Sequence, residues 1–98
     1  MFDKLKSVEQ RFEEIGEQLM DPQIVSDQNA YKKLMKEHKQ LSPIVEKFRE
    51  YSAAKQSAEE AKELLDAGGL DKDFKELVEE EYADSKAKIE TIADELKI

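Results

Sequence analysis

The sequence predicts an all-α fold, a three-helix antiparallel bundle or helical hairpin with one long central helix over about residues 27–66. Two observations predict it. Apolar side chains recur at intervals of three and four residues through most of the 98-residue chain, which places them on one stripe of a helix. Turn signals interrupt this spacing at Asp21-Pro22 and at Gly68-Gly69, and so divide the chain into three helical segments.

The first helix is predicted over the segment before Asp21. Its large apolar residues follow the three-and-four spacing from Leu5 to Leu19, and the opposite face is acidic. Asp3 is a candidate N-cap, because its carboxylate can accept hydrogen bonds from backbone N–H groups that have no helical partner. Proline lacks the N–H that a helix interior needs, so Pro22 ends this helix.

The long second helix is predicted to begin after a cap formed by Ser26 or Asp27 and to reach about residue 66. Pro43 is compatible with a kink or with a restart of the helix, and the absence of a glycine or polar loop beside it favours a kinked continuous helix. The apolar stripe drifts after Phe48, so we expect the first and third helices to pack on different parts of the long one.

The third helix follows Gly68 and Gly69, which supply the left-handed backbone that ends a helix. Asp71 or Asp73 can cap it, and its apolar spacing continues to the end of the sequence. No stop signal follows Leu96, so we expect this chain to be a piece cut from a longer protein.

The three apolar stripes can be buried only against one another, which predicts a core with members from all three helices and a single domain over residues 1–98. The predicted core residues are Leu5, Val8, Phe12, Ile15, Leu19, Leu34, Leu41, Val45, Phe48, Phe74, Val78, Tyr82, Ile89 and Ile92.

The composition restricts what this domain can do. The net charge of −8 opposes extended nucleic-acid binding, because phosphate affinity depends on lysine and arginine. The absence of cysteine excludes disulfides and thiolate chemistry, and it fits a reducing cytoplasm. No apolar run exceeds two residues, so a signal peptide and a membrane span are not expected.

No pattern of catalytic residues is found in the sequence. The carboxylates, including the run Glu79–Glu81, fall on the polar faces of helices and not in a desolvated cleft. His38 lies close to the apolar seam, where a partly buried structural histidine is expected. We therefore predict no catalytic, cofactor-binding or metal-binding residues, and a chain that is not an enzyme.

The stretch from 19 to 48 also carries a family resemblance. Its features are Asp21-Pro22, Ser26-Asp27, the spaced Tyr31, Leu34, Lys36-Glu37 and Leu41, and the closing Pro43-Ile44-Val45. This pattern resembles the N-terminal helical domain of the bacterial class I peptide chain release factors, and within that family the release factor 1 branch over release factor 2.

The resemblance implies a protein that recognises stop codons and triggers peptidyl-tRNA hydrolysis in the cytoplasm. The Gly-Gly-Gln and Pro-x-Thr motifs expected for those activities are absent, and Gly68-Gly69 is followed by Leu70. The resemblance therefore implies a non-catalytic domain that contacts the stalk base of the large ribosomal subunit and the class II release factor GTPase.

Lys32, Lys36 and Lys39 share one helix face. This face is either a solvated surface or, in a factor that works on the ribosome, a contact with ribosomal RNA. An alternative function is a freestanding coiled-coil adaptor or dimerisation module, because it would show the same three-and-four spacing. An intramolecular bundle predicts a monomer, whereas the adaptor predicts a dimer.

Overall fold

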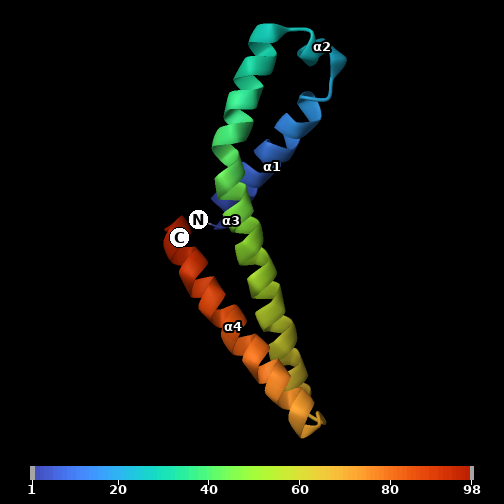
Figure 1. The fold of residues 1–98 in the computed structure, drawn as a ribbon, viewed down its shortest axis with the longest axis vertical. Coiled ribbons are helices and arrows are strands. Elements are labelled where there is room, and N and C mark those ends of the chain that lie inside the picture. Colours follow the sequence, from blue (N-terminus) through green and yellow to red (C-terminus); the bar gives the residue numbers. More distant parts are fainter. Residues whose placement is uncertain (1, 98) are drawn as a thin grey trace. The chain divides into compact units, whose positions relative to one another are not determined.

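The computed structural model describes residues 2–97, and all regular structure in that range is helical (Figure 1). The elements in chain order are α1 (Phe2–Gln18), α2 (Pro22–Val25), α3 (Gln28–Ala67) and α4 (Lys72–Leu96). The predicted all-α class is confirmed. The predicted long central helix over about 27–66 is confirmed to within one residue at each end.

The chain divides into two compact units, Met1–Lys47 and Phe48–Ile98. The first unit contains α1, α2 and the first part of α3, and the second contains the rest of α3 and α4. The predicted use of different parts of the long helix by the first and third helices is therefore confirmed. The expectation of a single domain over residues 1–98 stays a prediction.

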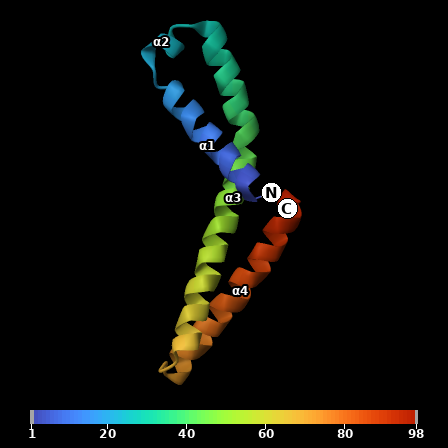
Figure 2. The ribbon, with the colours of Figure 1, turned by 180° about the vertical axis from the view of Figure 1, so that it is seen from behind.

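In the first unit, α1 and the first part of α3 run in opposite directions and are joined through α2 (Figure 2). Ile15 on α1 and Val45 on α3 are fully buried. The other predicted core residues of this unit are half-buried, namely Leu5, Val8, Phe12, Leu19, Leu34 and Leu41. Two tightly packed positions thus anchor a small core with a partly exposed margin.

The connection between α1 and α3 contains a helical turn, α2, where the sequence predicts only a break between helices. The Asp21 carboxylate accepts a hydrogen bond from the backbone N–H of Gln23 at 3.0 Å. Pro22 occupies the first turn of α2, where a backbone N–H would have no helical partner, so its absence loses no hydrogen bond. Of the two candidate caps for α3, Asp27 is the one used, because its Oδ1 accepts from the Ala30 N–H at 3.2 Å. Ser26 ends α2 instead.

The prediction of Asp3 as the N-cap of α1 is wrong. The helix already includes Phe2, so Asp3 lies inside the first turn, where its carbonyl oxygen accepts a hydrogen bond from the Ser7 hydroxyl. A negative side chain in this turn still interacts favourably with the positive end of the helix dipole.

The helix α3 continues through Pro43, as predicted, and does not restart there. Proline has no N–H to donate to the carbonyl of Lys39, so one helical hydrogen bond is missing at this point. The side chain of Pro43 is exposed, so it contributes little packing in return.

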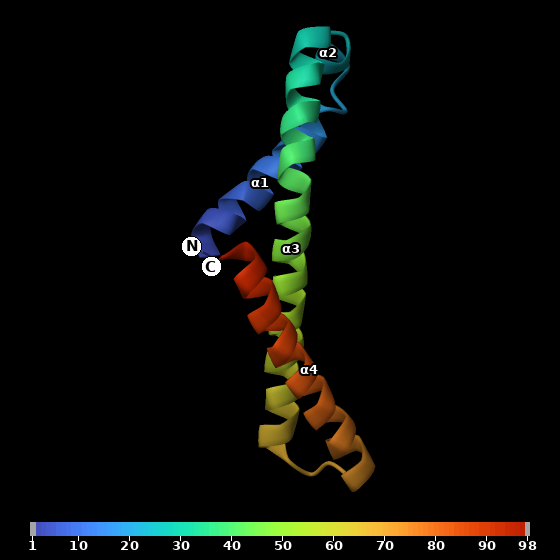
Figure 3. The same ribbon diagram turned by 60° about the vertical axis from the view of Figure 1, so that its left-hand side comes forward.

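In the second unit, α4 runs antiparallel to the second part of α3 (Figure 3). Gly68 and Gly69 in the connecting turn have φ angles of 71° and 74°, the left-handed backbone predicted for them. Asp71 caps α4 by accepting the N–H of Phe74 at 2.8 Å, whereas Asp73 lies within the first turn.

The buried residues of the second unit are mostly small. They are Phe48, Ala54, Ala58 and Ala61 on α3, and Val78, Ser85 and Ile92 on α4. The predicted core list included Phe48, Val78 and Ile92 but omitted the three alanines, which carry little apolar surface each. Alanine at these positions lets a neighbouring helix approach closely.

The prediction of Phe74 as a core residue is wrong, because its side chain is 45% exposed. The buried positions of α4 repeat every seven residues, at Val78, Ser85 and Ile92. At 100° per residue Phe74 lies at the same angle around α4 as the buried Ile92, so its exposure follows from its place in the first turn of the helix, at the end of the hairpin. Tyr82 and Ile89, also predicted as core, are half-buried.

Candidate partner-binding surfaces

A polar and aromatic cluster joins α1 to α3 within the first unit. The Arg11 guanidinium donates two hydrogen bonds to the Glu37 carboxylate, from Nε at 2.8 Å and from Nη2 at 3.0 Å. Next to this pair, the Phe12 ring stacks on His38 with 4.2 Å between ring centroids. The half-buried position predicted for His38 is confirmed, and the stacking gives this side chain a structural role.

The Arg11–Glu37 pair makes stability depend on pH. Hydrogen bonding from Arg11 is the main cause that lowers the pKa of Glu37 below 4.5, and the carboxylate in turn raises the pKa of Arg11. A carboxyl group whose pKa is lower in the folded state stabilises the fold above its unfolded-state pKa. This contribution is lost as the pH falls through the folded-state value, below 4.5.

We therefore expect Glu37→Gln to lower the melting temperature at pH 7 and to have progressively less effect as the pH falls below about 4.5. Thermal melts monitored by circular dichroism between pH 7 and pH 3 measure this difference. In an Arg11→Met background the Glu37→Gln effect should largely disappear at every pH. An equal effect at pH 7 and pH 3 would contradict the assignment. The side chains are 41% and 39% exposed, so added salt should weaken the effect.

The predicted contact residues Lys32, Lys36 and Lys39 are all exposed on α3. Their spacing of four and three residues places them on one face of the helix, as predicted. Within residues 2–97 none of the three forms an ion pair, so their ammonium groups face solvent. The structure thus brings these lysines together on a convex surface of a single helix.

An apolar groove of about 210 Å³ lies on one flank of the α3–α4 hairpin. Its lining residues are Ser57, Glu60, Ala61, Leu64, Leu77, Val78 and Glu81. Leu64 and Leu77 are 43% and 64% exposed, so two large apolar side chains meet solvent at this groove. Its two charged lining residues, Glu60 and Glu81, are both acidic.

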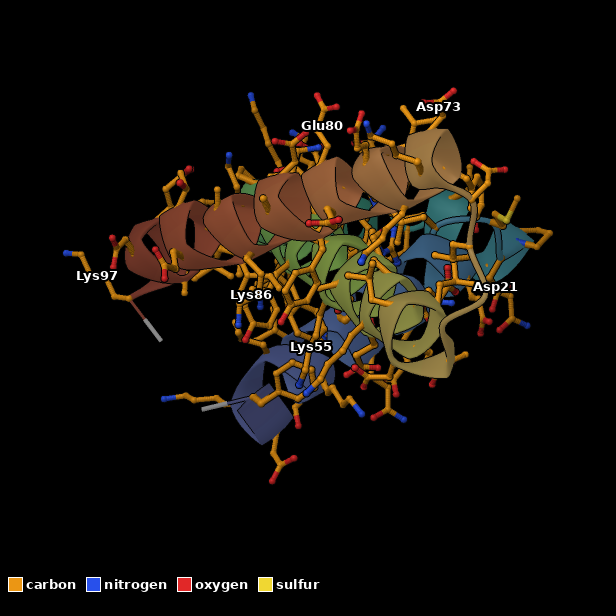
Figure 4. All side chains as sticks on the ribbon, turned by 90° about the horizontal axis from the view of Figure 1, so that it is seen from below. Asp21, Lys55, Asp73, Glu80, Lys86 and Lys97 are labelled. Carbon is orange, nitrogen blue, oxygen red and sulfur yellow. The ribbon has the colours of Figure 1, made fainter. Side chains whose placement is uncertain are left out.

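A second groove, of about 310 Å³, lies between the same two helices. Its lining residues are Tyr51, Lys55, Ala58, Glu59, Lys62, Tyr82, Lys86 and Ile89. We call it the lysine–tyrosine groove. At 100° per residue, Lys55 and Lys62 point to the flank of α3 opposite Glu60. Figure 4 shows Lys55 and Lys86 on the same side of α4, away from Glu80.

Neither groove was predicted from the sequence. Each groove combines residues from two helices that are separated by 13 or more positions in the chain. The available signal was the spacing of Tyr51, Lys55 and Lys62 along one flank of α3. Without the pairing to α4, that spacing looks like an ordinary solvated helix face.

Among residues 2–97, no group of three or more histidine, cysteine, aspartate or glutamate side chains is arranged to hold a metal ion. No helix in this range combines the length and the apolar character needed to span a bilayer.

Comparison with known proteins gives a consistent result. The family model described as the PCRF domain matches residues 8–98. Peptide chain release factor 1 of Caldicellulosiruptor saccharolyticus is 46% identical over all 98 residues, which is 27% of that protein. The proteins of the same name from Alkaliphilus oremlandii and Lactococcus lactis subsp. lactis are 42% and 39% identical, each over 28% of its length.

The chain thus spans about a quarter of the length of these curated relatives. No significant match was found among the solved structures. The matched residues include α2, α3 and α4 in full and most of α1. The family suggested by the stretch from Asp21 to Val45 is therefore confirmed, and the chain belongs to the PCRF domain family, as a counterpart of the helical N-terminal domain of peptide chain release factor 1.

Proposed function

We propose that this chain is the non-catalytic helical domain of a translation termination factor and that it acts by binding the ribosome. The observation that carries the proposal is the similarity of the whole chain to about a quarter of proteins named peptide chain release factor 1. Such a factor recognises stop codons and triggers peptidyl-tRNA hydrolysis in the cytoplasm. The remaining three quarters of the relatives' length would contain the groups for those two steps.

The described side chains support a binding role over a catalytic one. His38 is held against Phe12, and the Glu37 carboxylate is paired with Arg11, so neither is presented to a substrate. The run Glu79–Glu81 is exposed on α4, as predicted for a solvated face. What the chain does present to a partner is one exposed lysine face and two grooves.

The partners in the full-length factor would be the stalk base of the large ribosomal subunit and the class II release factor GTPase. We propose Lys32, Lys36 and Lys39 as one ribosome contact, because their exposed ammonium groups would displace counterions from ribosomal RNA. The isolated chain would be a monomer, since each of its two compact units has buried apolar residues of its own.

Co-sedimentation with 70S ribosomes and separated large subunits tests the proposed function. We expect the chain to pellet with both at low salt and to compete with full-length release factor 1. A Lys32→Gln/Lys36→Gln/Lys39→Gln variant should bind less. Absence of ribosome binding, together with a stable dimer in analytical ultracentrifugation, would favour the adaptor alternative instead.

A further inference from the structure

The lysine–tyrosine groove is an exception to the charge of the unit that contains it. Residues 48–98 include 8 basic and 15 acidic side chains. Yet the groove is lined by three lysines and one glutamate, Glu59, so its local charge is positive. Within this acidic unit the groove therefore offers a polyanion a locally positive surface.

The lysines converge from two helices. Lys55 and Lys62 are seven residues apart on α3, about 10 Å along the helix axis, so they can contact different phosphates of one strand. Lys86 comes from α4, and its ammonium group lies 6.0 Å from the centroid of the Tyr82 ring. This distance is at the outer limit of a cation–π contact, and it places the Lys86 charge beside the Tyr82 ring.

The groove is also lined by apolar and aromatic side chains. Ala58 is buried, and Ile89, Tyr51 and Tyr82 are half-buried. Tyrosine beside lysine suits a nucleic acid strand, because the ring can stack on a base and the hydroxyl can donate to a phosphate. An acidic peptide would use the lysines but would gain nothing from base stacking.

We propose that the lysine–tyrosine groove binds the backbone of a single-stranded RNA segment and is a second surface through which this chain contacts ribosomal RNA. The contact with ribosomal RNA rests on the proposed function, whereas the binding of single-stranded RNA does not. The groove differs from the face of Lys32, Lys36 and Lys39, where a single helix presents charge on a convex surface with no tyrosine from a second helix.

The test measures binding of a labelled single-stranded oligouridylate of about 12 nucleotides to the 98-residue chain by fluorescence anisotropy. The first variant is Lys55→Gln/Lys62→Gln/Lys86→Gln. The matched control is Lys72→Gln/Lys75→Gln/Lys88→Gln, which removes the same charge from exposed lysines of the same unit that do not line the groove. Circular dichroism verifies that both variants keep their helical content.

We expect the groove variant to lose at least about tenfold in affinity at 50 mM salt, and the salt dependence of log K to become shallower by about 2. The control should lose less than threefold. Tyr82→Leu, which keeps the lysines, should weaken RNA binding but not binding of poly-glutamate. Equal losses in the two triple variants, a larger loss in the control, or poly-glutamate binding as tight as RNA would overturn the proposal.

Ribosome co-sedimentation separates this proposal from the proposed function. RNA binding through the groove without any ribosome binding would contradict the proposed function and leave the groove as an RNA site. If the groove variant kept full ribosome binding and unchanged oligonucleotide affinity, the proposal that the groove binds RNA would be contradicted. The proposed function would not be affected.

Discussion

Truncation of Phe48 to alanine is expected to lower the free energy of unfolding by about 3–5 kcal/mol, the usual cost of removing a buried phenylalanine ring. Its side chain is only 3% exposed, and it is the largest of the buried side chains of the second unit. Removing its ring therefore takes away a large part of the apolar surface buried in that unit.

Phe74 provides the matched control, because the same substitution removes the same atoms from a side chain that is 45% exposed. We expect Phe74→Ala to cost no more than about 1 kcal/mol. Urea unfolding followed by circular dichroism measures both variants against the parent chain. Similar losses for the two substitutions would show that Phe74 belongs to the core after all, or that Phe48 does not.

The helices and their ends could be predicted largely from local sequence. The caps at Asp27 and Asp71 and the glycine turn depend on hydrogen bonds and backbone angles within a few residues. The residue types at those neighbouring positions are enough to predict them. One error was local, because Asp3 lies inside the first turn of α1 and not at its N-cap. The error at Phe74 depends on tertiary packing, because this residue has the right spacing for the apolar stripe but lies in the first turn of α4, where the hairpin ends.

The candidate surfaces divide in the same way. The lysine face of α3 follows from spacing within one helix, so its exposure could be predicted from Lys32, Lys36 and Lys39 alone. The two grooves could not, because they exist only once α3 and α4 pair in a particular register. That register depends on the buried alanines at 54, 58 and 61, whose individual apolar surface is too small to stand out in a sequence pattern.

Replacement of Pro43 by alanine is expected to stabilise the chain by about 2 kcal/mol. Proline within a helix costs about 3 kcal/mol relative to alanine, through the missing hydrogen bond to the Lys39 carbonyl and the ring clash. Against this, proline restricts the unfolded chain, and losing that restriction costs about 0.4–1 kcal/mol. Because Pro43 is exposed within the continuous helix α3, little packing is lost in the exchange.

Thermal melting measures this gain, which corresponds to an increase of roughly 8–16 °C for a chain of this size. Ile44→Ala is the control, since it changes the next residue, which is 40% exposed, without restoring a backbone hydrogen bond. We expect that control to be neutral or slightly destabilising. If Pro43→Ala left the melting temperature unchanged or lowered it, the proline ring would have to stabilise α3 through contacts that outweigh a full helical hydrogen bond.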